Sequence, residues 1–325
     1  MTNQEFLTST EAARNQIDLR LLELIPESPK SLYDPIRYTL ESGGKRIRPL
    51  LTYLSSLSDP NADWLPAACA VELLHNFTLV HDDIMDNAAW RRNRKTIHTL
   101  YDVNTAILAG DAIIAIAEES LSSGRYELSD EMMSEFAFGF RCVCEGQAYD
   151  KEFETRNDVT VEEYRTMIDL KSAKMLELAA VLGAYSAGGM FVEAAREFAH
   201  HTGIAFQIRD DLLDLTADTS VFGKTFGGDI SEGKRTFLYV TAMDHFADID
   251  PHDQDLLLRI QDKATTEHDI HHARELFTRL GVMQKAQEAI EAETIIARNF
   301  LEDISDENVK KGLLGFGEFL LGRKY

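Results

Sequence analysis

Two groups of aspartates with the same spacing lie far apart in the sequence. Residues 82–86 read Asp-Asp-Ile-Met-Asp and residues 210–214 read Asp-Asp-Leu-Leu-Asp, and each group ends an apolar helical pattern. In a helix the first and fifth positions lie one turn apart on one face, so the outer aspartates of each group point together. Because such carboxylates repel one another, and more so when desolvated, the pattern predicts a divalent counter-ion. Mg²⁺ suits it, since this ion takes one or two carboxylates and completes its shell with water and phosphate oxygens.

Other interpretations of the aspartates are a solvated acidic surface and structural calcium. The apolar residues between the aspartates argue against a fully solvated face, and the second copy of the spacing argues against coincidence. An EF-hand is excluded, because the loop glycine and the terminal glutamate are missing at the required spacing.

Lysines and arginines gather near the aspartates although the net charge of the chain is −22. Arginine offers forked donors to phosphate oxygens and lysine a compact charge, and glycines beside some of them let the backbone approach a ligand. Together the two kinds of cluster predict a site for a diphosphate bridged through Mg²⁺. The cations occur at positions 45, 46 and 48, 91, 92, 94 and 95, 171 and 174, and 224, 234 and 235.

The segments that carry these residues have helical periodicity. No proline occurs between Pro66 and Pro251, and strand-like alternation is scarce. Thr160 with Glu163 reads as a capping box at a helix start. Several helices are apolar nearly all round, which is typical of the interior of a large bundle. We therefore expect an all-α fold, a large single-domain helical bundle around a central cavity, over residues 1–325. The clearest helical patterns are 67–80, 106–121, 132–153 and 161–184.

Composition limits the partners and the compartment. The chain has 325 residues, 44% apolar, with 55 acidic against 33 basic residues, which disfavours binding to nucleic acid or anionic membranes. Residues 1–11 lack an apolar signal core, and the apolar run 106–117 is too short to span a bilayer. Three cysteines give no disulfide framework and are expected to be buried thiols. We expect a soluble cytoplasmic protein without stable membrane insertion.

With these motifs in order, the chain resembles the trans-type polyprenyl (isoprenyl) diphosphate synthases. Specific matches cover roughly residues 30 to 240, and the remainder is compatible but unspecific. The matching motifs are Gly-Gly-Lys-Arg-Ile-Arg-Pro at 43–49, the first aspartate motif with Arg91-Arg92, Gly110-Asp111, Gly146-Gln147 with Asp150, Lys171-Ser172, Phe206-Gln207 before the second aspartate motif, and Lys224 and Lys234.

The resemblance implies a prenyltransferase that joins isopentenyl diphosphate to an allylic diphosphate (dimethylallyl, geranyl or farnesyl). It implies a helical bundle with a deep cavity, a homodimer, and three Mg²⁺ ions, with Mn²⁺ as an accepted substitute. By position, Asp82 and Asp86 would hold two ions and Asp210 the third. The catalytic set would be completed by Asp83, Asp211, Asp214 and Lys171.

The same resemblance assigns the substrate contacts. The allylic diphosphate would be held by Arg91, Lys171, Ser172, Gln207, Lys224 and Lys234, and isopentenyl diphosphate by Lys45, Arg48, His75 and Arg92. By itself, a lone histidine such as His75 is more often a satisfied core residue. The sequence departs from the usual Arg-Arg-Gly-x-Pro-Thr after the arginines, since residues 91–96 read Arg-Arg-Asn-Arg-Lys-Thr. Asn93 tolerates the left-handed backbone of a turn, whereas loss of the proline is expected to loosen the loop.

Phe77 and Thr78 are the candidates for the floor that limits product length. Phe77 lies five residues before Asp82, about 7.5 Å along a helix, although an isolated aromatic is more often core packing. An aromatic followed by a small residue at this position resembles archaeal-type geranylgeranyl diphosphate synthases, so we expect a twenty-carbon product. The alternative products are farnesyl and farnesylgeranyl diphosphate. Less favoured functions are a terpene cyclase, which rarely needs the early 43–49 motif, a non-catalytic synthase subunit, which would lose aspartates, and a structural metal-binding protein.

Overall fold

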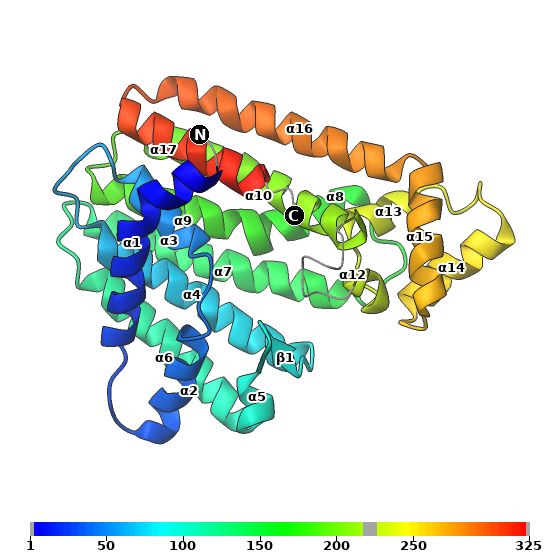
Figure 1. Ribbon diagram of the computed structural model, residues 1–325, viewed down its shortest axis with the longest axis horizontal. Coiled ribbons are helices and arrows are strands. Elements are labelled where there is room, and N and C mark those ends of the chain that lie inside the picture. The colour runs from blue at the N-terminus through cyan, green and yellow to red at the C-terminus, as the bar shows by residue number, and fades with distance from the viewer. Residues whose placement is uncertain (1–2, 217–225, 323–325) are drawn as a thin grey trace. The chain divides into compact units, whose positions relative to one another are not determined.

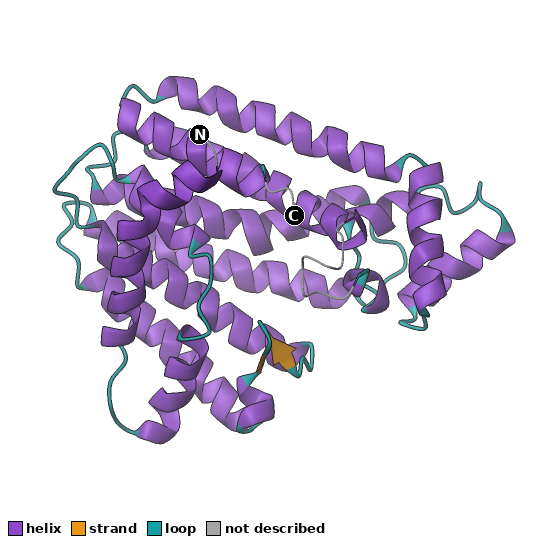
Figure 2. Cartoon of the chain, viewed as in Figure 1, coloured by secondary structure: helices purple, strands orange, loops and turns teal. Residues whose placement is uncertain are grey.

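The computed structural model describes residues 3–216 and 226–322. Helices dominate, and a hairpin of two-residue strands is the one sheet among the described residues (Figures 1 and 2). The expected all-α fold is confirmed. The elements in the first half are α1 (Asn3–Glu23), α2 (Lys30–Leu40), α3 (Ile47–Ser55), α4 (Trp64–Met85), β1 (Trp90–Arg91), β2 (Arg94–Lys95), α5 (Ile97–Leu100), α6 (Val103–Ser122) and α7 (Ser129–Phe153). The second half contains α8 (Val161–Ile168), η1 (Asp169–Ala173), α9 (Lys174–Ser186), α10 (Val192–Thr216), α12 (Gly228–Ser231), α13 (Phe237–Met243), α14 (Pro251–Gln261), α15 (Glu267–Arg279), α16 (Val282–Phe300), η2 (Leu301–Asp303) and α17 (Glu307–Leu321).

The chain forms two compact units. Unit 1 comprises residues 1–140, 175–196 and 301–316, and unit 2 comprises residues 141–174, 197–300 and 317–325. The expectation of one domain over residues 1–325 stays a prediction.

In unit 1, α4 packs most extensively against α6 and then against α3. Helix α4 is buried nearly all round, because alanines and aliphatic residues occupy most of its turns. Glycine lets α6 approach α4 closely, since a Cβ at Gly110 would fall 2.2 Å from His81 Nε2. The position of the first aspartate motif is thus set by a tightly packed helix pair.

The core of unit 2 gathers residues from α8, α10, α13 and α16. Helix α13 packs against α8 and α16, and α15 packs against α14 and α16. The capping box expected at Thr160 and Glu163 is present and begins α8. These contacts position the second aspartate motif on α10.

The helix expected over residues 161–184 is not one continuous α-helix. Residues 169–173 form a π-helix (η1) between α8 and α9. Such a widened turn shifts the apolar periodicity by about one residue. Over the 24 positions of the pattern, this shift is too small to distinguish a π-helix from a continuous α-helix. The prediction was therefore wrong at a segment that contains two candidate site residues, Lys171 and Ser172.

Cys69 and Cys142 are buried as expected, whereas Cys144 is exposed. Cys142 and Cys144 are two positions apart on α7, so the two side chains lie on different faces of that helix. Among the described helices, none combines the length and the apolar character needed to span a bilayer.

Candidate active site

The first aspartate motif lies at the C-terminal end of α4. Asp86 is the residue that caps the helix, and its backbone N–H donates to the Asp82 carbonyl at 2.8 Å. Asp83 is buried at 5% exposure and accepts a hydrogen bond from Arg91 Nε at 2.7 Å. Burial raises the pKa of Asp83, and the Arg91 charge opposes this rise. Asp82 is half-buried and Asp86 exposed, so the outer two carboxylates are the accessible ones.

Arg91 and Arg92 belong to the hairpin β1–β2, in which Arg91 pairs with Arg94. The two turn residues, Arg92 and Asn93, have φ values of 50° and 60°, which are typical of a type I′ turn. The turn expected from Asn93 is confirmed. Arg92 Nη1 donates to the Gly43 carbonyl, so the hairpin contacts the glycine-rich loop.

That loop, residues 43–48, combines an exposed lysine with a half-buried arginine. Lys45 is exposed, and burial lowers the pKa of Arg48 to about 10 against the opposing charge of Glu72. Burial and the charges of Arg48 and Arg92 hold the pKa of His75 well below its ordinary value. His75 is therefore neutral at physiological pH and lies within the field of the arginines predicted to bind the same substrate.

Phe77, the predicted floor residue, is 9% exposed on α4. Its ring centroid lies 4.5 Å from that of His81 and 5.2 Å from that of Phe140. Thr78 is half-buried and donates through Oγ1 to the His75 carbonyl at 2.8 Å. These contacts fit core packing, and the role of the two residues in product length stays a prediction.

The second aspartate motif repeats the burial pattern of the first. Asp211 is buried at 5% exposure, whereas Asp210 is exposed and Asp214 half-buried. Asp214 Oδ2 accepts a hydrogen bond from the Asp229 N–H at 3.1 Å. In each motif, the middle carboxylate faces the protein and the outer two remain more accessible.

Three donors hold the Asp211 carboxylate. Tyr164 Oη donates at 2.6 Å, the Phe237 N–H at 2.9 Å and Gln207 Nε2 at 3.2 Å. Burial, followed by the negative charge of Asp229, raises the pKa of Asp211 to about 7, and the three donors oppose that rise. Asp211 is thus fixed by α8, α10 and α13 together.

Lys171 and Ser172 lie in the π-helix η1. Lys171 Nζ pairs with Asp150 Oδ2 at 2.5 Å, and Ser172 Oγ donates to Gln207 Oε1 at 2.8 Å. Gly146 allows this approach, since a Cβ there would fall 2.4 Å from the Lys171 backbone nitrogen. A continuous set of contacts therefore connects Lys171–Ser172 with Gln207 and the buried carboxylate of the second motif.

Lys234, the last predicted allylic contact within the described residues, pairs with Asp229 at 3.1 Å and Glu232 at 2.7 Å. Although burial opposes it, these two carboxylates raise the pKa of Lys234, so the side chain is charged. Lys224 lies outside the described residues.

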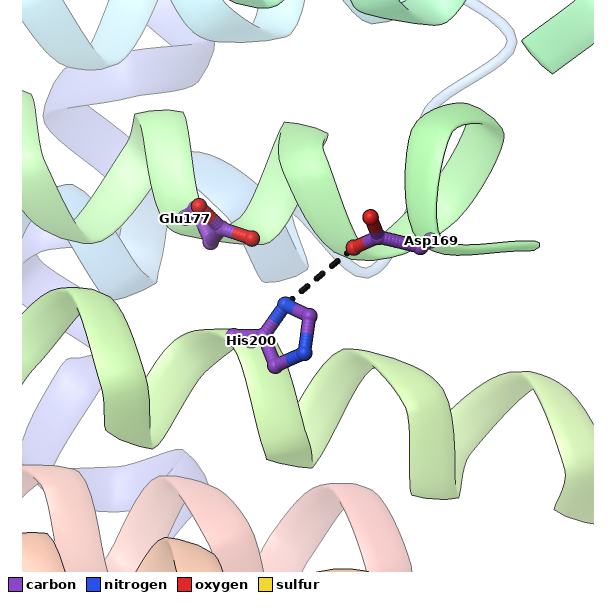
Figure 3. Close-up of side chains that lie close together, drawn as sticks. All are labelled: Asp169, Glu177 and His200. Carbon is purple, nitrogen blue, oxygen red and sulfur yellow. Dashed lines mark ion pairs between the residues drawn. The ribbon is translucent and has the colours of Figure 1, made fainter. Parts of the chain in front are cut away.

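Several residues at the two motifs were missed by sequence reasoning. Tyr164 on α8 and Asp229 on α12 contact the second motif, although neither residue belongs to a recognisable motif of its own. Another pair that lies outside the motifs joins α10 to the start of η1, where His200 Nδ1 lies 3.1 Å from Asp169 Oδ1 (Figure 3). Glu177, labelled in the same view, lies two helical turns farther along the chain from Asp169. Only the spatial structure identifies these partners, because each is remote in sequence or unremarkable in type.

The accessible outer aspartates provide the hard oxygen donors that Mg²⁺ prefers. In both motifs the outer aspartates are exposed or half-buried, whereas the middle one is buried. The donor sets at Asp82, Asp86 and Asp210 therefore fit divalent cations.

Comparison with known proteins gives one consistent result. Residues 29–277 match the family model described as polyprenyl synthetase. The chain is 37% identical to a geranylfarnesyl diphosphate synthase of Natronomonas pharaonis, over 96% of this chain and 99% of the relative. It is 39% identical to a geranylgeranyl diphosphate synthase of Methanosarcina mazei, over 73% of this chain and 75% of the relative. Among solved structures, a geranylgeranyl pyrophosphate synthetase from Pyrococcus horikoshii covers 99% of both chains with a TM-score of 0.91 and 32% identity.

Proposed function

The chain belongs to the polyprenyl synthetase family, and from that premise we propose that it condenses isopentenyl diphosphate with an allylic diphosphate. The strongest support for this activity is that the two aspartate motifs have the same burial pattern. In each, the middle aspartate is buried and the outer two are more accessible. Two such motifs accompanied by Lys and Arg suit substrates that carry diphosphates.

Asp82 and Asp86 would hold two Mg²⁺ ions and Asp210 a third, with Mn²⁺ as a substitute. The bound ions supply positive charge that stabilises diphosphate as a leaving group. Asp83 and Asp211, held by Arg91 and Tyr164 respectively, would keep the neighbouring carboxylates oriented.

Two cationic sets would bind the two substrates. In unit 2, Lys171 pairs with Asp150, and Ser172 donates to Gln207. The allylic diphosphate would be held by Lys171, Ser172 and Gln207 together with Arg91, Lys224 and Lys234. Lys45, Arg48, His75 and Arg92, all in unit 1, would hold isopentenyl diphosphate. A neutral His75 would contribute a hydrogen bond rather than a charge.

In the reaction, the allylic carbon–oxygen bond breaks and both of its electrons leave with diphosphate. The double bond of isopentenyl diphosphate then supplies the electron pair of the new carbon–carbon bond, and the departed diphosphate accepts the proton that is lost. Side chains that stabilise the leaving charge lower the barrier. Apolar faces of the helices below the aspartates would exclude water, which would otherwise capture the carbocation.

The proposed product is geranylgeranyl diphosphate, and a homodimer is the proposed state. Relatives named as geranylgeranyl diphosphate synthases and the aromatic Phe77 support the twenty-carbon product. Relatives named as geranylfarnesyl diphosphate synthases make the twenty-five-carbon chain the second candidate.

A condensation assay tests the proposal. Purified protein is incubated with labelled isopentenyl diphosphate, Mg²⁺ and each of dimethylallyl, geranyl and farnesyl diphosphate, and product lengths are measured by chromatography. We expect chain elongation with at least one primer and none in the presence of a chelator. Cyclic hydrocarbons without elongation would indicate a terpene cyclase, and no product with any primer would indicate a non-catalytic subunit.

A further inference from the structure

A buried ionic network lies behind the glycine-rich loop and takes no part in the proposed reaction steps. At its centre is Arg46, which is 4% exposed. Its Nη1 donates to Glu72 Oε1 at 2.7 Å, its Nε to Asp18 Oδ1 at 2.7 Å and its Nη2 to the Leu40 carbonyl at 3.1 Å. Glu72 itself is 2% exposed. All of these residues belong to unit 1.

The backbone of Arg46 itself adopts a conformation that is unfavourable for any residue other than glycine. Its φ is 49°, in the left-handed region, where a residue with a Cβ is sterically strained. Such a conformation persists only when surrounding contacts impose it. The three inward hydrogen bonds of the guanidinium supply that constraint. Because Lys45 precedes Arg46 and Arg48 follows two residues later, the same constraint fixes where these two cations lie.

Glu72 is held in turn by its own helix. Asn76 Nδ2, one turn later on α4, donates to the Glu72 carbonyl at 2.7 Å and lies 3.4 Å from Oε1. The carboxylate therefore has little freedom to follow a moving arginine. It is a fixed point on α4, which also carries His75 and the first aspartate motif.

The charge of Glu72 also acts on the substrate cations. Burial lowers the pKa of both Arg48 and Arg92, and the Glu72 carboxylate opposes this in each case. Without that carboxylate, Arg46, Arg48 and Arg92 would repel one another in a partly desolvated region. Glu72 thus favours a loop in which these cations stay together before any diphosphate arrives.

We propose that Glu72 is a positioning residue for the isopentenyl diphosphate subsite, because it anchors Arg46 and thereby fixes the loop that presents Lys45 and Arg48. This inference rests on the proposed condensation activity. Glu72 acts without touching the substrate, since its carboxylate faces Arg46 and Asn76.

The test separates the two substrates. In Glu72→Gln, which keeps the shape and removes the charge, we expect KM for isopentenyl diphosphate to rise at least tenfold. KM for the allylic diphosphate should stay within about twofold of wild type, because Arg91 pairs with Asp83 and the other described contacts lie in unit 2. Glu135→Gln is the matched control. It breaks the Arg196–Glu135 pair, whose side chains are about 20% exposed and which also lies in unit 1, and it should change neither KM.

A second variant separates a change in KM from a loss of folding stability. Breaking a buried ion pair on one side is destabilising, whereas replacing both partners with apolar residues of similar size is often neutral or stabilising. Arg46→Met/Glu72→Leu should therefore recover the thermal unfolding midpoint while KM for isopentenyl diphosphate remains raised.

Three results would overturn the proposal: an unchanged KM for isopentenyl diphosphate in Glu72→Gln, an equal rise of both KM values, or a double variant that restores the isopentenyl diphosphate KM together with stability. If Glu72→Gln does not fold, the two KM values of the double variant are compared with those of wild type instead. Failure of the proposed function looks different, since the wild-type protein would then make no elongated product.

Discussion

Tyr164 is the residue whose importance the sequence gives least reason to suspect. It lies within the apolar face of α8, where an aromatic is ordinary, yet its hydroxyl donates to the buried carboxylate of Asp211. The aspartate motifs themselves are recognisable, because carboxylates one helical turn apart repel one another and the same spacing occurs twice between apolar residues. Their partners cannot be predicted in this way, since a donor can come from any residue that the fold brings near.

We expect Tyr164→Phe to lower kcat about tenfold, equivalent to roughly 1.4 kcal/mol, with little change in folding. Asp211 would lose its shortest hydrogen bond and keep those from the Phe237 N–H and Gln207. Steady-state kinetics over a range of Mg²⁺ concentrations is the measurement. Tyr239→Phe is the control, because it removes another buried hydroxyl of unit 2, which donates to the Leu257 carbonyl at 3.3 Å. An equal loss in both variants would mean that the contact with Asp211 has no special role.

Phe77 is the residue predicted to limit product length. If Phe77 forms the floor of the product site, its replacement by Ala should lengthen the products, because the ring would no longer limit the growing chain. Since Phe→Ala in a core costs roughly 3–5 kcal/mol, Phe77→Leu is a milder companion that should give an intermediate shift. Chromatography of the chain lengths decides, and an unchanged distribution in both variants would leave Phe77 as a core residue only.

At the scale of the elements, the helices could be predicted but the widened turn could not. The patterns at 67–80, 106–121 and 132–153 fall within α4, α6 and α7, because an apolar face repeats every three to four residues. The π-helix η1 follows no such rule. Its residues contact Gly146 on α7, Asp150 and Gln207, and none of these is local in sequence.

Gly146→Ala tests the importance of that approach. The added Cβ would meet backbone atoms of Lys171 at 2.4 Å and 2.7 Å, so η1 would have to shift. Because a displacement of about 1 Å at a reacting centre can cost a hundredfold, we expect kcat/KM for the allylic diphosphate to fall by about that factor. Gly139→Ala, on the same helix, is the control, since its Cβ would meet the flexible end of Leu178 at 3.0 Å. Similar activity in the two variants would contradict the expected role of the π-helix.

At the scale of the whole molecule, the free energy of unfolding should depend on the N-terminal cap of α15, which lies far from the aspartate motifs in sequence. Asp269 completes a capping box at the start of α15 with Thr266 and also pairs with Arg259 at 2.7 Å. The Thr266 N–H, and then Arg259, lower the pKa of Asp269 to about 2 against the effect of burial. A folded-state pKa below the unfolded value of about 3.9 means that the ionised carboxylate stabilises the fold above about pH 4. That contribution disappears as the pH falls towards about 2.

Asp269→Asn should therefore lower the denaturation midpoint at about pH 7, and the difference from wild type should shrink as the pH falls from about 4 to about 2. Denaturant unfolding at several pH values is the measurement. A difference that stays constant across this range would show that the charge of Asp269 does not contribute.

The hairpin at residues 90–95 has a consequence for the entropy of substrate capture. The expectation that the missing proline loosens this loop stays a prediction. In the structure its residues form a two-residue type I′ turn, and Arg92 at the tip donates to the Gly43 carbonyl. That hydrogen bond restricts the Arg92 guanidinium before a ligand arrives. Binding of a diphosphate at this arginine should therefore cost less side-chain entropy than binding at an arginine without such a contact.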